Sequence, residues 1–214
     1  MLIVTSILLA FAIDAAWAER GRRQDQRRAI QALHQDFSAA AELLRQVAQD
    51  HRDGVLAGES LLRYTGPQAP SIEDDSIAAF IPPLIRIPYF SPSLGSLDAL
   101  LSSGNLGVIE SPELRMALAE FPVALAALNR TQEYGSRLVL GQFLPAISPY
   151  IPLRRYGMAS RGATAFDGDV RALMTRLEFE NLVQVRLMNH ELALRATVAL
   201  EERIMRLLDL LADD

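Results

Sequence analysis

The chain has neither cysteine nor lysine among its 214 residues. The first absence excludes disulfides, cysteine nucleophiles, iron–sulfur clusters and thiolate zinc sites. The second excludes the lysine of a P-loop and Schiff-base chemistry. All 21 basic residues are therefore arginines, and the net charge of −5 gives no reason to expect a nucleic-acid partner.

Catalytic patterns are also missing. None of the three histidines stands in an H-E-x-x-H spacing, and there is no G-x-S-x-G. The close carboxylate pairs at 74–75, 167–169 and 178–180 stand at helix starts, where the helix dipole favours acids. We therefore predict no catalytic residue, no metal ligand and no cofactor, and we expect a protein that is not an enzyme.

The first segment is the most apolar part of a chain that is 50% hydrophobic. Leu2 to Ala18 would span roughly 26 Å as a helix, close to the ~30 Å hydrocarbon core of a bilayer. Trp17 stands where an interfacial aromatic belongs, and Asp14 and Arg20 lie near it at the expected headgroup level. The pattern predicts a transmembrane anchor over 1–19 and a lipid bilayer as partner.

The same segment permits a second interpretation. Ala16-Trp17-Ala18 fits the small-x-small rule for signal cleavage, which would give a secreted helical protein cut near Ala18. We favour the retained anchor, because the helical pattern continues past this point and no basic residue precedes the apolar run. The five arginines between positions 20 and 28 place the body in the cytoplasm by the positive-inside rule.

A heptad seam follows the arginines. Its apolar members are spaced 3, 4, 3, 4 and 3 residues apart: Ile30, Leu33, Phe37, Ala40, Leu44 and Val47. The next seam positions, His51 and Gly54, weaken the pattern, so the helix should end between Gly54 and Gly66. A homodimer through residues 30–47 is one partner that this seam predicts; an unknown protein is the other.

Two proline-rich stretches, 66–95 and 145–166, should be irregular. Within the first we expect a short helix over 71–80 with Ser71 as its N-cap. The run IPPLIRIPYF at 81–90 should be extended and packed on a helical face. Directly after the second, a helix start is expected near Asp167 to Asp169.

A corner between two helices is predicted around LLSSGNLGVIESPELR. Gly104 should end a helix over 94–103 in the left-handed conformation, and Ser111 should cap the next helix, with Pro112 as its first residue. A phosphate-cradling loop is the alternative, but Leu106 and its apolar neighbours favour the corner. The next helix has leucines or phenylalanine spaced 4, 3, 4 and 3 apart, and Pro122 should kink or break it.

The last long helix is expected over 178–212. Its seam carries polar residues at three of nine positions, so we expect it to be buried only in part. His51 and His190 both fall on seam lines and would form a pH-sensitive contact if they met. The favoured interpretation is that neighbouring polar groups satisfy each histidine at the bundle margin.

Together the elements predict an all-α fold. An N-terminal transmembrane helix continues into an elongated bundle of three long helices, joined by short helices and proline-rich connections. The bundle domain should span 20–214.

Three stretches resemble a large, uncharacterised family of bacterial single-pass membrane proteins. They are the apolar start that ends in Trp-x-Glu, the region from Tyr89 to Leu118, and EFENLVQVRLMNHEL at 178–192. The central signature comprises Ser103, Gly104, Leu106, Ser111, Pro112, Leu114 and Arg115. The resemblance implies the bacterial inner membrane, with the body on the extracytoplasmic side and a basic leader encoded upstream of Met1. The family has no established activity, so no catalytic residue follows from it.

The expected function is therefore a membrane-anchored helical bundle that acts by contact, as a scaffold, accessory or interaction module. The alternative is a sensor-type domain that lodges a small molecule between its helices, which requires a concave pocket with convergent polar groups.

Overall fold

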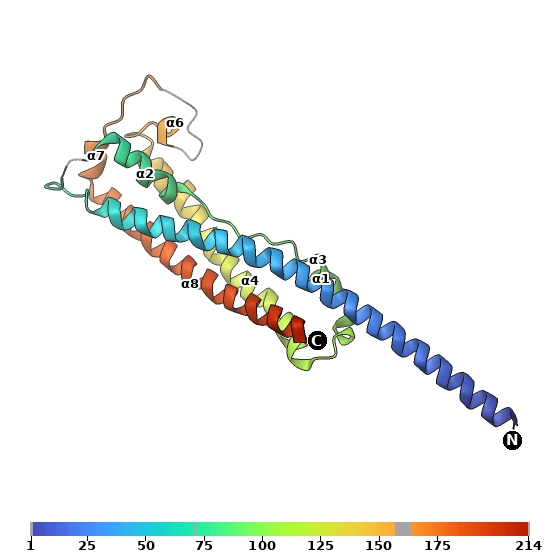
Figure 1. Ribbon diagram of the computed structural model, residues 1–214. Helices are drawn as coiled ribbons and strands as arrows, with labels where there is room; N and C mark the ends of the chain where they lie inside the picture. The colour runs from blue at the N-terminus through green and yellow to red at the C-terminus, as the bar shows by residue number, and fades with distance from the viewer. Residues whose placement is uncertain (1, 71, 157–163, 214) are drawn as a thin grey trace. The chain divides into compact units, whose positions relative to one another are not determined.

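The computed structural model describes residues 2–70, 72–156 and 164–213. Every regular element in these residues is helical, which confirms the all-α prediction (Figure 1). The three long helices are α1 (Leu2–Leu62), α4 (Pro112–Leu138) and α8 (Leu177–Asp213). The short α-helices are α2 (Asp74–Ile85), α3 (Gly95–Ser102), α5 (Leu144–Ile147), α6 (Leu153–Tyr156) and α7 (Val170–Met174). A 3₁₀ turn, η1 (Asn105–Val108), and a π-helical turn, η2 (Val139–Phe143), complete the set.

The first helix runs without a break from Leu2 to Leu62, and its end falls in the predicted window. Among the described residues, no helix combines the length and apolarity that crossing a bilayer requires. The side chains of residues 1–10 and 12, within the expected anchor, lie outside the described residues. The transmembrane helix over 1–19 therefore stays a prediction.

The chain divides into two compact units, and each long helix contributes to both. Unit 1 comprises Met1–Glu42, Pro92–Pro122 and Glu202–Asp214, and unit 2 comprises Leu43–Ser91 and Val123–Glu201. In unit 1 the rings of Phe37 and Phe121 meet edge to face, with centroids 5.1 Å apart. The Asp36 carboxylate accepts a hydrogen bond from the Ser96 backbone N–H at 2.9 Å, which satisfies a free donor in the first turn of α3.

The predicted corner lies in unit 1 and has the expected geometry. Gly104 has a φ of +67° and follows α3 directly. The Ser111 hydroxyl accepts from the Leu114 N–H at 3.2 Å, as an N-cap should. Arg115 donates to the Ile109 carbonyl at 2.8 Å, so the signature arginine ties the loop to α4. Helix α4 continues through Pro122, so the break considered there does not occur.

Unit 2 has an apolar core where α1, α2, η2, α7 and the start of α8 meet. Its buried members include Leu61, Ile77, Ile81, Leu84, Val139, Phe143, Ile147, Leu173, Phe179 and Val183. The last helix is as predicted in extent, but its seam is better buried than expected. His190 and Thr197 are fully buried. His190 contacts His51, and the Thr197 hydroxyl donates to the Ala193 carbonyl of the same helix.

The prediction of an extended segment over 81–90 is wrong in its first half. Helix α2 runs from Asp74 to Ile85 and contains Pro82 and Pro83; only the residues from Arg86 onward are extended. Burial explains the difference, since Ile77, Ile81 and Leu84 lie on one helical face in the core. The free energy gained by burying these side chains exceeds the cost of the two backbone N–H donors that the prolines lack. The expected N-cap, Ser71, lies outside the described residues, and Glu73 takes the N-cap position.

The second proline-rich stretch is also more helical than expected. The π-helical turn η2 precedes Pro145, and its wider turn accommodates a residue without an N–H. Helix α5, which begins at Leu144, continues into this stretch, and α6 lies within it. Asp169 caps α7 by accepting from the Ala172 N–H at 2.9 Å, which confirms the helix start predicted there.

The seam over 30–47 packs within the chain. From Leu33 to Val47 its members are 0–3% exposed. A homodimer through this seam stays a prediction, and it would have to open packing that the monomer already has.

Candidate functional site

Four polar side chains lie together inside unit 2, each no more than 3% exposed. We call them the polar layer: His51 of α1 with Arg186, Asn189 and His190 of α8. Buried polar groups are costly unless they find partners, so the bonds within the layer decide what it does.

The two histidines that the sequence placed on seam lines do meet. Their Nδ1 atoms are 3.1 Å apart, and their ring centroids are separated by 5.3 Å. One ring donates through Nδ1–H and the other accepts, so the two imidazoles hold different tautomers or charge states. The favoured interpretation of separate, marginal histidines is therefore wrong, because His51 and His190 are 3% and 0% exposed and contact each other.

Gly54 makes the room for this contact. A Cβ at this position would lie 2.4–2.6 Å from three atoms of the His190 ring. The glycine follows His51 by three residues on α1, so the seam does not fade there. The apolar seam of α1 instead continues with the polar His51 and then with Gly54, where the His190 ring occupies the space that a side chain would take.

Arg186 connects α8 to the end of α2. Its Nε donates to the Leu84 carbonyl at 2.8 Å, and its Nη2 donates to the Arg86 carbonyl at 2.5 Å. Its Nη1 donates to Asn189 Oδ1 at 2.5 Å. The last carbonyls of a helix carry partial negative charge and need donors, so the guanidinium is both partner and counter-charge for this end of α2.

The segment that follows α2 is also bound to α1, by an ion pair. Arg86 forms an ion pair with Asp50 at 2.5 Å, with the carboxylate side chain 16% exposed. Arg186 itself has only neutral acceptors among the described residues.

Helix α4 approaches the layer at Gly135. A Cβ there would lie 2.8 Å from Asn189 Oδ1 and 3.3 Å from Arg186 Nη1. Gln132, one turn earlier on the same helix, is 3% exposed. Within the described chain, several buried atoms here lack a hydrogen-bond partner: His51 Nε2, His190 Nε2, Asn189 Nδ2, Gln132 Nε2 and Gln132 Oε1.

Burial controls the charge state of the layer. It lowers the pKa of His51 to about 4, helped by the Arg186 charge and opposed by Asp50. It lowers the pKa of His190 to about 2, again helped by Arg186 and then by His51. Burial also lowers the pKa of Arg186 to about 10, so at neutral pH the layer holds one cation and two neutral imidazoles.

This arrangement suits packing better than catalysis. A soluble substrate cannot reach side chains that are 0–3% exposed. No group of three or more His, Asp or Glu side chains is placed to hold a metal ion in the described residues.

The surface of unit 2 offers a different feature, which we call the apolar groove. Tyr134 of α4 and Val185, Met188 and Leu192 of α8 line a depression of about 590 Å³. These four large side chains are 37–56% exposed. Asn189 of the polar layer, Glu191 and Arg195 also line it.

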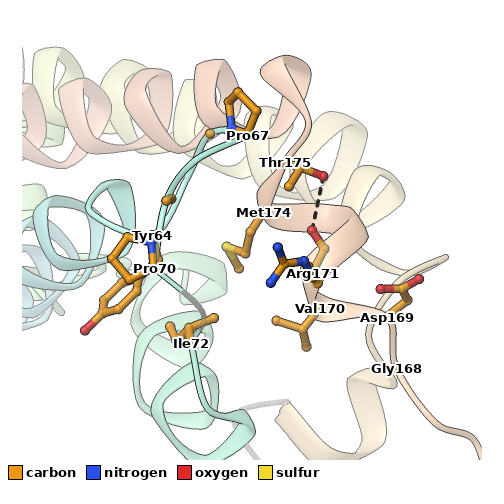
Figure 2. A pocket seen from close by; sticks show the side chains of 12 residues that line it. Tyr64, Pro67, Pro70, Ile72, Gly168, Asp169, Val170, Arg171, Met174 and Thr175 are labelled. Carbon is orange, nitrogen blue, oxygen red and sulfur yellow. Dashed lines mark hydrogen bonds between the residues drawn. The ribbon is translucent and has the colours of Figure 1, made fainter.

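A smaller pocket lies between the residues after α1 and helix α7, with a volume of about 260 Å³. Figure 2 shows Tyr64, Pro70 and Ile72 on one side and Arg171 and Met174 on the other. The Thr175 hydroxyl, at its edge, donates to the Arg171 carbonyl at 3.2 Å. This volume is just below the usual range for small-molecule sites.

The sites expected from sequence are distributed differently. Asp14, Trp17 and Arg20 are exposed on α1. The signature corner belongs to unit 1, whereas the polar layer belongs to unit 2. Sequence reasoning missed Arg186, Asn189 and Gln132. A signal was present, since Gln132 and Gly135 continue the seam of α4 with the same polar-then-glycine pattern that His51 and Gly54 give α1.

Comparisons of the chain with protein-family models, curated proteins and solved structures yield no match.

Proposed function

We propose that this chain is a helical interaction module, held at a membrane by the start of α1, which acts by binding a protein surface through the apolar groove. The observation that carries the proposal is the groove itself. Met188 and Leu192 are 56% and 50% exposed and adjoin Tyr134 and Val185. Clustered exposed apolar side chains are typical of protein contact sites.

The location of the ionisable groups supports contact over catalysis. The histidine pair and the buried arginine of unit 2 are out of reach of solvent. The groove, in contrast, is accessible, and most of its surface is hydrophobic, as at the centre of a protein interface, with Glu191 and Arg195 as its two charged side chains.

A photo-crosslinking amino acid tests the contact function. Placed at Met188 or Leu192 in the full chain, it should give a discrete protein adduct in cells that express the chain. Leu56 of α1, which is 61% exposed, is the matched control position and should give none. Equal labelling from all three positions, or none from the groove, would overturn the proposal.

The membrane part of the proposal rests on the start of α1. Phe11, Ile13 and Trp17 are 67%, 48% and 69% exposed, so the described apolar side chains here are not covered by the protein. The resemblance to bacterial single-pass proteins supports an inner-membrane anchor with the body on the extracytoplasmic side. The chain should resist alkaline extraction from membranes, and the double variant Phe11→Arg/Ile13→Arg should be extracted, because each arginine costs about 2.5–3.5 kcal/mol in a bilayer. A reporter fused after Asp214 that is active only in the cytoplasm would reverse the orientation.

The pocket in Figure 2 supports the sensor alternative as a second candidate. Its size limits a ligand to a small molecule, and its lining has one cationic side chain, Arg171, and one anionic side chain, Asp169. Because the Asp169 carboxylate already caps α7, Arg171 is the residue that would bind a carboxylate ligand. Ligand-detected NMR of the full chain with a library of small carboxylates tests this. Binding that Arg171→Ala abolishes would establish a ligand site, and absence of any hit would remove the candidate.

A further inference from the structure

We propose that the apolar groove binds the same groove of a second copy of this chain, with the two α8 helices antiparallel. The inference rests on the contact function proposed above and names the partner. Its starting point is a line of four side chains on α8, spaced 3, 4 and 3 residues apart: Met188, Glu191, Arg195 and Val198.

Side chains at this spacing share one face of a helix. Met188 and Val198, at the two ends of the line, are 56% and 36% exposed, and Leu192 beside the line is 50% exposed. The face is therefore apolar at both ends and charged in the middle.

The charges decide the orientation. Neither Glu191 nor Arg195 forms an ion pair within the described residues. The two side chains have opposite charges. In two parallel α8 helices without an offset, Glu191 would face Glu191 of the other copy, and Arg195 would face Arg195. In two antiparallel helices related by a twofold axis at the level of position 193, Glu191 of each copy lies beside Arg195 of the other. The interface then contains two such pairs.

The apolar residues select the same axis. Position 193 is the midpoint of 191 and 195, and it is also the midpoint of 188 and 198. Met188 then lies opposite Val198 of the other copy, and the two Leu192 side chains meet beside the axis. One antiparallel alignment thus pairs both the opposite charges and the apolar side chains. The sequence of α8 is therefore complementary to itself, which favours a second copy over a partner of unrelated sequence.

The natural absence of cysteine makes disulfide trapping a direct test on the full chain in mild detergent. Leu192→Cys should form a covalent dimer on oxidation. A mixture of Met188→Cys chains and Val198→Cys chains should form the mixed dimer. Met188→Cys alone should not, because its two copies lie about 15 Å apart along the helices, too far for a disulfide.

Leu56→Cys is the matched control, since Leu56 is more exposed than Leu192 but lies on α1. It should remain monomeric. Crosslinking of Met188→Cys to itself, or of Leu56→Cys as strongly as Leu192→Cys, would overturn the antiparallel dimer.

A charge exchange tests the same interface without a covalent bond. Glu191→Arg and Arg195→Glu should each weaken dimerisation about tenfold or more, because each sets like charges together. The double variant should restore it, measured by sedimentation in detergent. Single variants that dimerise like the natural chain, or a double variant that stays monomeric, would overturn the proposal. A monomeric chain whose groove crosslinks to a different protein would end the dimer but leave the contact function; no groove adduct of any kind would end both.

Discussion

His51 and His190 lie 139 residues apart in sequence, on different helices, and contact each other through their Nδ1 atoms, which are 3.1 Å apart. At least one of these nitrogens must accept a hydrogen bond, so the pair cannot be doubly protonated while the contact exists. Arg186 adds a fixed positive charge next to both rings.

Stability should therefore fall on mild acidification. The folded-state pKa of each histidine lies below the unfolded value of 6.5, at about 4 for His51 and about 2 for His190. Well above pH 6.5 both histidines are neutral in the folded and in the unfolded chain, so their contribution to the free energy of unfolding does not change with pH. As the pH falls from there toward 4, only the unfolded chain takes up protons, so the free energy of unfolding should drop by about 1.4 kcal/mol per pH unit for each histidine. Urea unfolding across this window measures the slope.

The double variant His51→Gln/His190→Gln is the control for that slope. It keeps the titration of every carboxylate and removes both imidazoles. If the natural chain and the double variant lose stability in parallel between pH 6.5 and 4, the histidines are not responsible.

Gly54→Ala should destabilise the protein although alanine favours helices. Alanine ordinarily gains about 1 kcal/mol over glycine inside a helix. Here the new methyl group would lie 2.4–2.6 Å from the His190 ring, so we expect a net loss of about 1–3 kcal/mol in the free energy of unfolding. Gly141→Ala is the matched control in unit 2, because no atom lies within 4 Å of its Cβ position; an equal loss there would contradict the packing argument.

Arg186→Lys should cost about 2–4 kcal/mol, because an ammonium group cannot direct donors to Leu84, Arg86 and Asn189 in the same fork. Hydrogen exchange should rise at the end of α2 and in the crossover after it. A second variant, Arg186→Met, removes the charge and should raise the pKa of both histidines, which an NMR titration would detect. An unchanged histidine pKa would contradict the electrostatic role of Arg186.

Gly104→Ala should lower the free energy of unfolding of unit 1 by about 1 kcal/mol, because its φ of +67° is strained for a residue with a side chain. Gly107, three residues later in the same loop, has open space at its Cβ position and no positive φ. Gly107→Ala should be neutral, so equal effects at both positions would remove the conformational explanation. Chemical denaturation followed by circular dichroism measures both.

Local chemistry made much of the fold predictable. Heptad spacing located the three long helices, and single residues with one strong local role, such as Gly104, Ser111 and Asp169, behaved as their chemistry requires. The prolines at 82 and 83 misled the prediction, because the burial that keeps them helical depends on residues far away in sequence.

The candidate site was predictable only in part, for the same reason. His51 and His190 stood on seam lines, so their meeting could be considered from sequence. Arg186 could not be placed, because two of its three acceptors are main-chain carbonyls about a hundred residues away, and a carbonyl leaves no trace in a sequence pattern. The apolar groove is visible only once one face of α8 is known to be covered.

A seam of leucine and alanine alone is compatible with more than one register of the helices, and the polar layer excludes the alternatives. A displacement of α8 by one turn, about 5.4 Å, would bring Arg186 or Leu194 to the place over Gly54 that His190 now fills. It would also take the guanidinium away from the carbonyls of Leu84 and Arg86 and leave a buried charge without acceptors. Gly54, Gly135 and the buried Arg186 thus fix one register for the long helices of unit 2.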